Sequence, residues 1–401
     1  MFERTKNLRL SIIKQIELKA SAYPDVISLA QGIPNFDTPD CIKRRAELAL
    51  KRGVVARYSL SPGLPELREL IEISLAHQNM FYDWQKEIIV TAGSIEGITA
   101  SIMAITSPGD EIIIPEPTYT SYREAIELAG CKPVFAPLNE KEGWSFEIKK
   151  YEEAITDKTK AIFYCNPNNP TGTIYSRDQL LALAEIAEKH NLFLISDEVY
   201  KDFTFNNTDK IFSLAEIPSL RKRVIRLFSF SKAYAMTGWR IGYVHSDESV
   251  INEIIKVHDC LVTCAPVISQ YAAMGALEMG ESDVKRFNQQ YTRRRDLVCE
   301  RLEKLKDFFE YVRPESSYYV FPKLVAGRID PSVARKNGAD GEELVDSWEF
   351  ALKLLDKIQV AVVPGFAFGA GGEGHIRISF GRSEEDINNA FDRMDKYFNN
   401  L

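Results

Sequence analysis

The chain has 401 residues, of which 45% are hydrophobic and 27% are charged, and its formal net charge is −7. This length exceeds the size at which one hydrophobic core keeps growing, so we expect two subdomains. The acidic balance, with lysines and arginines scattered along the chain, disfavours binding to nucleic acid or to anionic membranes. The N-terminus lacks the apolar core of a signal peptide, and no uncharged apolar run reaches the ~20 residues that span a bilayer. We therefore expect a cytoplasmic protein.

The six cysteines form no CxxC pair and have no companion histidines at the spacing of metal ligands. We therefore expect free thiols in a reducing compartment and no metal site. The five histidines show no catalytic pairing by spacing, which favours a core or surface role for each of them.

Helical patterns alternate with short apolar strands from about Asp40 to Val244. Short, continuously apolar strands between helices indicate a sheet that is buried on both faces. This half of the chain therefore predicts an α/β domain with a mostly parallel sheet. The predicted strands are Glu87–Thr91, Glu111–Ile114, Pro133–Ala136, Ala161–Cys165, Leu192–Ser196, Val224–Phe228 and Ile241–Val244, and the helices include Ser94–Ile105, Ser121–Ala129 and Asp178–His190.

The pattern changes after Val244 and predicts a smaller α+β domain. We expect an N-terminal arm at residues 1–36 that joins the small domain, a large domain at 37–285 and the small domain at 286–401. Residues 325–345 are largely polar and contain glycine, so we expect a surface excursion there. The predicted elements are helical stretches around Asp247–Gly280 and Asp283–Phe309, antiparallel strands at Tyr318–Phe321, Gln359–Val363 and His375–Ser379, and a final amphipathic helix, Glu384–Phe398.

Lys232 follows the apolar strand Val224–Phe228, within the run Ser229-Phe230-Ser231-Lys232. Open α/β sheets place their ligands at the carboxyl ends of such strands. A lysine at this position is by itself more often a surface residue, but the residues that follow change this interpretation. The run from Ala233 to Tyr243 reads AYAMTGWRIGY and places Arg240 eight positions after the lysine.

This lysine-to-Trp-Arg-x-Gly-Tyr pattern resembles the signature of fold-type I pyridoxal-phosphate (PLP) enzymes, the large family of class I/II aminotransferases. The resemblance spans the chain from about Ser28 to Met394. It implies a PLP-binding large domain with a mostly parallel sheet and a smaller α+β domain. It also implies that Lys232 carries pyridoxal 5'-phosphate as a Schiff base and that Arg240 binds the cofactor phosphate.

Two further segments agree with the resemblance in the expected order. In Asn166–Gly172, NPNNPTG, it implies that Asn169 hydrogen-bonds the phenolic oxygen of PLP, although turn chemistry alone explains the composition. In Ser196–Tyr200, SDEVY, it implies that Asp197 pairs with the protonated pyridine nitrogen and Tyr200 with the phenolate oxygen. An isolated aspartate after a strand is more often a helix N-cap.

The predicted catalytic residues are Lys232, Asp197 and Tyr200. PLP is an electron sink that works best with a protonated ring nitrogen, and a nearby carboxylate favours this charged form. Once the substrate has displaced the amine of Lys232, that amine can move a proton between the substrate Cα and the cofactor.

The predicted phosphate site begins where Thr91-Ala92-Gly93-Ser94-Ile95 ends a strand and opens a helix. Backbone N–H groups at a helix N-terminus suit an anion, and a glycine there permits close approach. The planar guanidinium of an arginine binds phosphate in a fixed geometry. The resemblance assigns this cradle to Gly93, Ser94, Ile95, Ser229, Ser231 and Arg240.

The resemblance implies contacts of the remaining site residues with the pyridine ring of PLP, with the neighbouring subunit's site and with the substrate. Tyr119 matches the aromatic residue that stacks on the pyridine ring, with an ordinary half-buried tyrosine as the alternative. Tyr58 resembles the tyrosine that reaches the phosphate of the neighbouring subunit, which implies a homodimer with shared active sites. Arg377 lies in an apolar strand and matches the arginine that binds the substrate α-carboxylate, together with the backbone of Gly32 and with Asn169.

Three departures from the family pattern lie on the substrate side: Ser316-Ser317, Phe366 and Ile95, the last where relatives with acidic substrates place a lysine. They favour an apolar or aromatic amino donor over aspartate. We therefore expect a PLP-dependent aminotransferase that moves an amino group from an L-amino acid to a 2-oxo acid such as 2-oxoglutarate.

A PLP-dependent lyase or synthase on the same scaffold, such as a carbon–sulfur lyase, is the alternative, because its cofactor contacts would be the same. A PLP-binding regulatory domain is disfavoured, because the acidic chain shows no N-terminal helix-turn-helix module. An NAD-dependent fold is disfavoured as well, since no G-x-G-x-x-G follows a strand.

Overall fold

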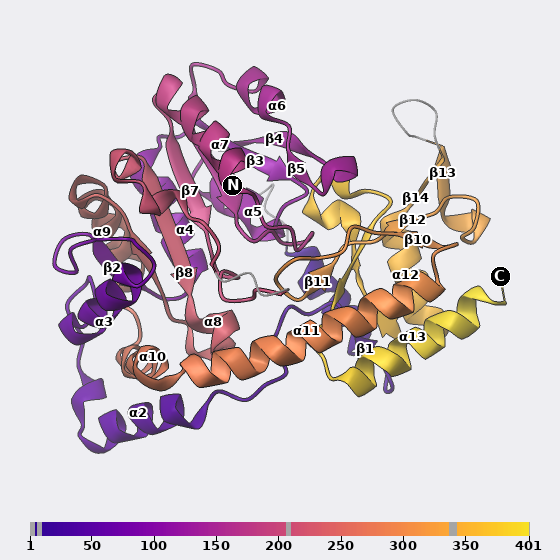
Figure 1. Ribbon diagram of the computed structural model, residues 1–401, viewed down its shortest axis with the longest axis horizontal. Coiled ribbons are helices and arrows are strands. Elements are labelled where there is room, and N and C mark those ends of the chain that lie inside the picture. Colours follow the sequence, from indigo (N-terminus) through magenta and orange to yellow (C-terminus); the bar gives the residue numbers. More distant parts are fainter. Residues whose placement is uncertain (1–4, 6–9, 206–209, 337–342, 401) are drawn as a thin grey trace.

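A computed structural model describes residues 5, 10–205, 210–336 and 343–400 (Figure 1). An eight-stranded sheet with the order β2-β9-β8-β7-β6-β3-β4-β5 forms its centre. Strands β8, β7, β6, β3 and β4 are parallel, and the pairs β2–β9, β9–β8 and β4–β5 are antiparallel. The predicted α/β fold with a mostly parallel sheet is therefore confirmed. The strands are β2 (Ile88–Thr91), β3 (Glu111–Glu116), β4 (Lys132–Asn139), β5 (Ser145–Phe146), β6 (Thr159–Cys165), β7 (Phe193–Asp197), β8 (Val224–Ser229) and β9 (Gly242–His245).

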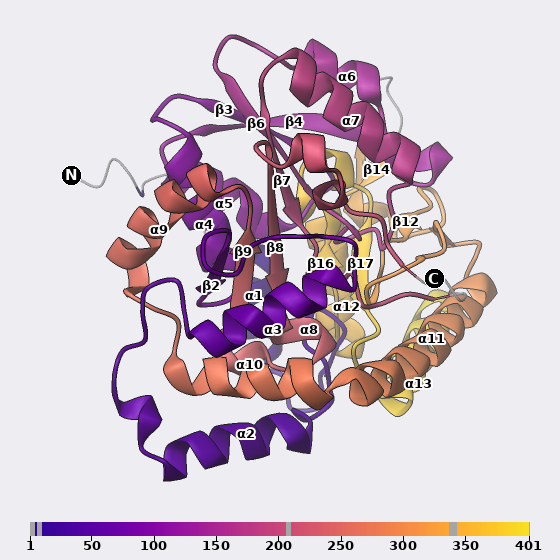
Figure 2. The ribbon, with the colours of Figure 1, turned by 60° about the vertical axis from the view of Figure 1, so that its left-hand side comes forward.

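Helices cover both faces of this sheet (Figure 2). On one face lie α4 (Ser94–Ile105), α5 (Thr120–Leu128) and α9 (Glu248–Val262), and on the other lie α6 (Ile148–Glu153) and α7 (Arg177–Lys189). Because both faces are covered, strands such as β2 and β8 are buried along their whole length. Helix α10 (Val267–Met279) packs against α2 (Asp40–Lys51) and α3 (Pro65–Ala76).

The long helix α11 (Glu281–Lys304) leads from this part to the C-terminal part of the chain (Figure 1). There β11 (Tyr319–Val320), β17 (Ile376–Ser379) and β16 (Val363–Pro364) form an antiparallel sheet in that order. β1 (Ile27–Ser28) pairs in parallel with β15 (Val360–Ala361), which ties the N-terminal segment to this part. Helices α12 (Ser347–Ile358) and α13 (Glu384–Phe398) pack beside each other.

The remaining elements are short. Two helices matter for the site, α1 (Ile12–Ala20) and α8 (Phe230–Ala233). Two antiparallel pairs lie near the C-terminal part, β10 (Phe309–Glu310) with β12 (Lys323–Leu324) and β13 (Ala334–Lys336) with β14 (Glu343–Val345). The 3₁₀ helices are Val54–Ala56, Glu140–Glu142, Leu214–Glu216, Pro218–Leu220, Thr237–Trp239, Pro331–Val333, Gly365–Phe368 and Ala370–Gly372.

Three segments differ from the sequence-based expectation or extend it. The predicted strand Gln359–Val363 is two strands, β15 and β16, because one half pairs with β1 and the other with β17. The predicted helical stretch Asp247–Gly280 is interrupted after α9, where Thr263 has a φ of 62° and a proline precedes α10. Within the predicted excursion 325–345, β13 and β14 form a hairpin, and residues 337–342 lie outside the described part.

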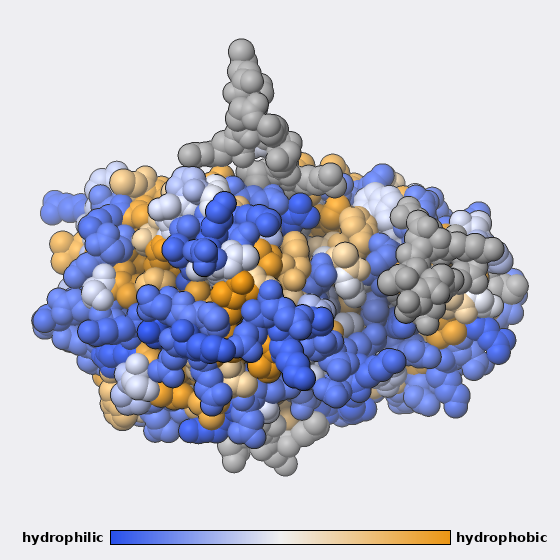
Figure 3. Space-filling view, turned by 90° about the horizontal axis from the view of Figure 1, so that it is seen from above, coloured by the Kyte–Doolittle hydropathy of each residue, from blue (hydrophilic) through white to orange (hydrophobic). Residues whose placement is uncertain are grey.

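Hydrophilic side chains cover most of the face of the molecule seen in Figure 3, with hydrophobic groups scattered between them. Such scattered apolar groups are ordinary on the surface of a folded protein. Among the described residues, no helix has the length and apolar character needed to cross a membrane.

Candidate active site

A cavity of about 850 Å³ lies where β7 and β8 end and α4 begins. This is the carboxyl edge of the parallel strands, where the sequence predicts the site. All predicted site residues line this cavity except Gly93 and Tyr58. The predicted residues in its lining are Gly32, Ser94, Ile95, Tyr119, Asn169, Asp197, Tyr200, Ser229, Ser231, Lys232, Arg240 and Arg377.

A guanidinium and two hydroxyls lie near the start of α4. Gly93 precedes this helix with a φ of 84°, and a Cβ there would lie 2.3 Å from Nη2 of Arg240, so the glycine lets the guanidinium approach the helix end. Ser229 Oγ accepts the Ser231 N–H at 3.2 Å and donates to Ser231 Oγ at 2.9 Å. Hydroxyls, a guanidinium and a helix N-terminus together suit a phosphate-like anion.

Asp197 ends β7 and is 3% exposed. Tyr122 OH donates to its Oδ2 at 2.8 Å, and the Val199 N–H donates to its Oδ1 at 3.2 Å. Burial raises the pKa of this carboxyl to about 6, although the hydrogen bond from Tyr122 acts in the opposite direction. Pairing with a cationic ligand would relieve the cost of keeping this carboxylate buried.

Lys232 lies on α8, and its Nζ donates to the carbonyl of Gly32 at 2.7 Å. Burial lowers the pKa of this amine to about 8, and the positive charges of Arg377 and Arg240 act in the same direction. An amine with this pKa is neutral in a substantial fraction near pH 8, which allows it to act as a nucleophile and as a base.

Arg377 lies on β17 and is 1% exposed. Its Nη1 donates to Asn169 Oδ1 at 3.0 Å, its Nη2 donates to the Ala30 carbonyl at 2.7 Å, and its Cζ lies 4.2 Å from the ring centroid of Tyr319. Its Nε has no hydrogen-bond partner among the described residues. A buried guanidinium that faces only neutral acceptors suits an anionic ligand such as a carboxylate.

Tyr200 and Tyr319 line the cavity, and Tyr318 lies next to them. Tyr200 OH accepts from Asn169 Nδ2 at 3.3 Å and lies 3.1 Å from Tyr319 OH. Tyr318 OH donates to the Gly32 carbonyl at 2.9 Å, and a Cβ at Gly32 would lie 1.8 Å from Tyr319 OH. The close approach of these tyrosines therefore requires glycine at this position.

The sequence-based prediction did not include Tyr122, Tyr319 or the contribution of α1. Tyr122 lies in the first turn of α5, three residues after Tyr119, which is the N-cap of that helix, so its nearness in the chain was the available signal. Helix α1 contributes Ile13, Lys14, Glu17 and Leu18 to the cavity lining. No signal in the sequence connects this helix with residues that follow it by more than a hundred positions.

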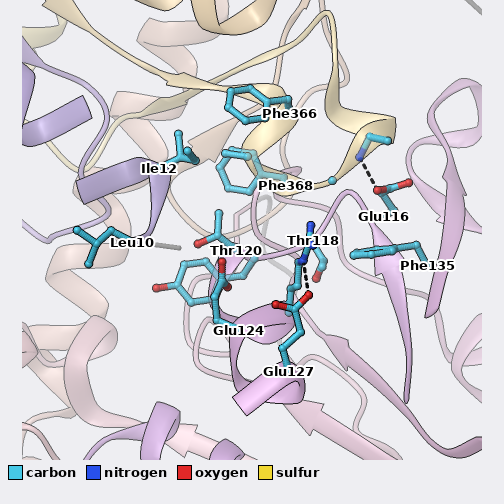
Figure 4. A pocket seen from close by; sticks show the side chains of 15 residues that line it. Leu10, Ile12, Glu116, Thr118, Thr120, Glu124, Glu127, Phe135, Phe366 and Phe368 are labelled. Carbon is cyan, nitrogen blue, oxygen red and sulfur yellow. Dashed lines mark hydrogen bonds and ion pairs between the residues drawn. The ribbon is translucent and has the colours of Figure 1, made fainter. Parts of the chain in front are cut away.

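Tyr58 and Phe366 lie away from this cavity, whereas Gly93 directly precedes the lining residue Ser94. Tyr58 is 84% exposed, so within one subunit it is not part of the site. Phe366 lines a second cavity of about 290 Å³, together with Phe368 and Phe135 (Figure 4). Tyr119 lines both cavities, and Glu116 accepts a hydrogen bond from the backbone of Ala370 beside the second one. Phe366 is therefore a neighbour of the site and not part of its wall.

A model of the family described as aminotransferase class I and II matches residues 24–394 of the chain. The chain belongs to this family. An aspartate aminotransferase of Pyrococcus abyssi is 37% identical to it over 97% of both chains. Aromatic-amino-acid aminotransferase 2 of Thermococcus litoralis is 34% identical, over 98% of this chain and 97% of the relative.

A solved structure leads to the same family. The aspartate aminotransferase from Thermus thermophilus with maleate has a TM-score of 0.89 and 32% identity, and the alignment covers 99% of both chains. The predicted resemblance is therefore confirmed, and this aminotransferase transfers an amino group between an amino acid and a 2-oxo acid.

Proposed function

We propose that this aminotransferase holds PLP in the 850 Å³ cavity and takes the amino group from an apolar or aromatic L-amino acid. The observation that carries this proposal is the convergence of Lys232, Asp197 and Arg240 on one cavity. PLP has an aldehyde, a basic ring nitrogen and a phosphate. An amine, a buried carboxylate and a guanidinium beside a helix N-terminus are complementary to these three groups.

The other residues that would hold PLP are matched to it by chemistry. The ring of Tyr119 would lie against the pyridine ring, and the hydrogen-bonded pair Asn169 and Tyr200 would bind the phenolic oxygen. When bound, PLP supplies an electron sink for the electrons left at the substrate α-carbon. The phosphate would be held by Gly93, Ser94, Ile95, Ser229, Ser231 and Arg240.

The chain's own groups position the substrate and move the proton. Arg377 would bind the α-carboxylate with its guanidinium, beside the backbone of Gly32 and the amide of Asn169. This fixes the α-carbon within reach of Lys232, whose Nζ would accept the α-proton and return it later. Because the pKa of this amine is lowered to about 8, it can carry out both steps near neutral pH.

The cavity wall supports an apolar or aromatic donor. Ile13 and Leu18 from α1, Ile33, and Ile95 and Ile98 from α4 line it. Apolar lining with a few fixed polar groups is typical of sites that bind an apolar side chain and orient it by its charged end. Of the three relatives named above, two are named for aspartate and one for aromatic amino acids, so a donor assay is needed to test the choice.

We expect the PLP-loaded protein to convert L-phenylalanine or L-leucine, with 2-oxoglutarate, into L-glutamate and the corresponding 2-oxo acid. The kcat/KM for L-phenylalanine or L-leucine should exceed the kcat/KM for L-aspartate by at least about tenfold, because the side-chain carboxylate of L-aspartate would lose its hydration against the isoleucines. Glutamate formation measures the reaction. A preference for L-aspartate would contradict the donor assignment. Release of pyruvate and ammonia from L-cystathionine without a 2-oxo acid would instead indicate a carbon–sulfur lyase.

A homodimer with shared active sites completes the proposal. Tyr58 is 84% exposed and Leu60 is 65% exposed, and Leu48 and Leu50 of the preceding helix are exposed as well. Exposed apolar side chains close together in the chain are typical of a surface that another subunit covers. Tyr58 would then reach the phosphate in the partner's cavity.

Mixing two variants tests this sharing. In a hybrid of a Tyr58→Ala subunit and a Lys232→Ala subunit, one site would combine an intact Lys232 with an intact Tyr58. We expect the reassociated mixture, at limiting PLP, to be more active than the mean of the two parents. Activity equal to that mean would show that each Tyr58 serves its own subunit. Lys232→Ala mixed with wild type provides the control for subunit exchange.

We also propose the chain division into an arm (1–36), a large domain (37–285) and a small domain (286–401). The pairing of β1 with β15 supports the link between the arm and the small domain. The six free cysteines support the proposed cytoplasmic location, where thiols stay reduced.

A further inference from the structure

We infer that His258 is a positioning residue for the cofactor phosphate, and that it acts through Glu96, which holds the turn at the start of the phosphate site. This inference rests on the proposed function, in which the backbone of Gly93, Ser94 and Ile95 binds the phosphate of PLP. His258 lies on α9 and is not part of the cavity lining, so its effect on the ligand is indirect.

Three hydrogen bonds hold the turn that leads from β2 into α4. The Gly93 N–H donates to the Thr91 carbonyl at 2.8 Å, and Thr91 Oγ1 donates to the Gly93 carbonyl at 3.0 Å. The third bond runs from the Ala92 N–H to Glu96 Oε2 at 3.1 Å. Only this third bond comes from a side chain outside the turn. The orientation of the turn relative to the helix therefore depends on where the carboxylate of Glu96 lies.

Glu96 lies in the first turn of α4, the part of the helix whose N–H groups would bind the phosphate. The helix dipole favours a carboxylate at this end, but a carboxylate that faced the cavity would repel a bound phosphate. The cavity lining includes the neighbouring residues Ser94 and Ile95 and does not include Glu96. For the site to bind an anion, the carboxylate of Glu96 has to stay away from the cavity.

His258 holds this carboxylate from the adjacent helix, since α9 and α4 pack side by side on one face of the sheet (Figure 2). Nδ1 of His258 lies 3.0 Å from Glu96 Oε1, and because a carboxylate only accepts, Nδ1 is the donor. The side chain of His258 is 0% exposed and that of Glu96 is 10% exposed, so water competes little for this bond. Nε2 of His258 has no hydrogen-bond partner among the described residues, so Glu96 is the group to which this ring is fixed.

The same turn also packs directly against Arg240. A Cβ at Gly93 would lie 2.3 Å from Nη2 of Arg240, and a Cβ at Gly242 would lie 3.1 Å from the backbone nitrogen of Ser94. There is thus no free space between the turn, the guanidinium and the start of β9. A displacement of the turn would therefore move the guanidinium as well as the N–H groups of the helix end.

Loss of the histidine has two consequences that act in the same direction. The bond to the Ala92 N–H is weakened, and the released carboxylate of Glu96 can turn toward the phosphate. Both changes weaken the binding of the phosphate, and neither involves Lys232 or Asp197. We therefore expect an effect on cofactor affinity that depends on the phosphate, with kcat preserved once the cofactor saturates the protein.

The test titrates the full chain, freed of cofactor, with PLP and with pyridoxal, which has the same ring and aldehyde but no phosphate. His258→Leu should raise the Kd of PLP about tenfold and leave the Kd of pyridoxal within about twofold of wild type, measured by fluorescence. His258→Asn, whose amide can place an N–H near the position of Nδ1, should keep the Kd of PLP within about threefold of wild type. At saturating PLP, the kcat of His258→Leu should stay within about twofold of wild type.

A double-mutant cycle tests whether His258 acts through Glu96. In a Glu96→Ala background, His258→Leu should change the Kd of PLP by less than about twofold, because its partner is already absent. His190→Leu is the matched control. Nε2 of His190 lies 3.9 Å from Glu152 Oε1 beside α6 and α7, on the other face of the sheet, so its loss should leave both Kd values unchanged.

An unchanged Kd of PLP in His258→Leu would overturn the inference. An equal rise in the Kd of PLP and of pyridoxal would do the same, because it is the result of a general loss of packing. If His258→Leu does not fold, His258→Gln replaces it with the same expected results, since its longer amide does not place an N–H at the position of Nδ1. If the wild type binds PLP no more tightly than pyridoxal, the proposed phosphate site itself is wrong, which is a separate result.

Discussion

Replacement of Lys232 by alanine is expected to abolish transamination and the visible absorbance of the bound cofactor. The amine on α8 lies in the cavity beside Arg240 and Asp197, and burial has already lowered its pKa to about 8. Loss of both the nucleophile and the proton carrier should lower kcat by at least about 10³-fold. Single-turnover absorbance with L-phenylalanine measures the effect.

Lys232→Arg serves as the matched variant, because it keeps a long cationic side chain but cannot act as a neutral amine near pH 8. It should be as inactive as Lys232→Ala, with unchanged far-ultraviolet circular dichroism in both. Normal turnover in either variant would remove Lys232 from the mechanism and with it the proposed place of the cofactor.

Replacement of Asp197 by asparagine should lower kcat/KM by about 10²–10³-fold, because the buried carboxylate is the group that would stabilise the protonated ring nitrogen. The pKa of Asp197 is raised to about 6. Below this pH the carboxyl takes up a proton and can no longer balance a cation, so the affinity of the cofactor-free protein for PLP should fall as the pH is lowered through about 6. Fluorescence titration with PLP at several pH values measures it.

Tyr122→Phe is the control that separates this charge effect from packing. The Tyr122 hydroxyl donates to Asp197 Oδ2 at 2.8 Å and lowers the pKa of that carboxyl. Its removal should shift the loss of PLP affinity to higher pH, whereas Asp197→Asn should show no such pH dependence in this range. A wild-type pH profile in Asp197→Asn would contradict the role assigned to this carboxylate.

The cofactor side of the site was predictable because its residues follow strands. Asp197 ends β7 and Ser229 ends β8, and adjacent parallel strands bring their carboxyl ends to one edge. Lys232 and Arg240 follow within the next residues of the chain, so a local motif was sufficient to bring them to the same place. The roles of these residues toward PLP stay predictions that the experiments above test.

The substrate side was less predictable, because it depends on contacts between distant segments. Helix α1 has only nine residues, and its position over the cavity depends on the bonds of Glu17 to Ser28 and Gln31. The split of Gln359–Val363 into β15 and β16 has the same origin. An apolar pattern predicts that a segment is a strand, but it does not predict with which partner it pairs.

The pairing of Ser229 with Gly242 at the ends of β8 and β9 also constrains chain length. Phe230 N–H donates to the Ile241 carbonyl at 3.2 Å, so the segment that carries Lys232 and Arg240 is a closed loop on a rigid base. One inserted or deleted residue would move the amine relative to the guanidinium while the strands stayed paired. We therefore expect random insertions to be tolerated between β13 and β14. Insertions in the loop that carries Lys232 and Arg240 should be lost under selection for activity. The number of residues in this loop should thus be constrained by function as strictly as their identities are.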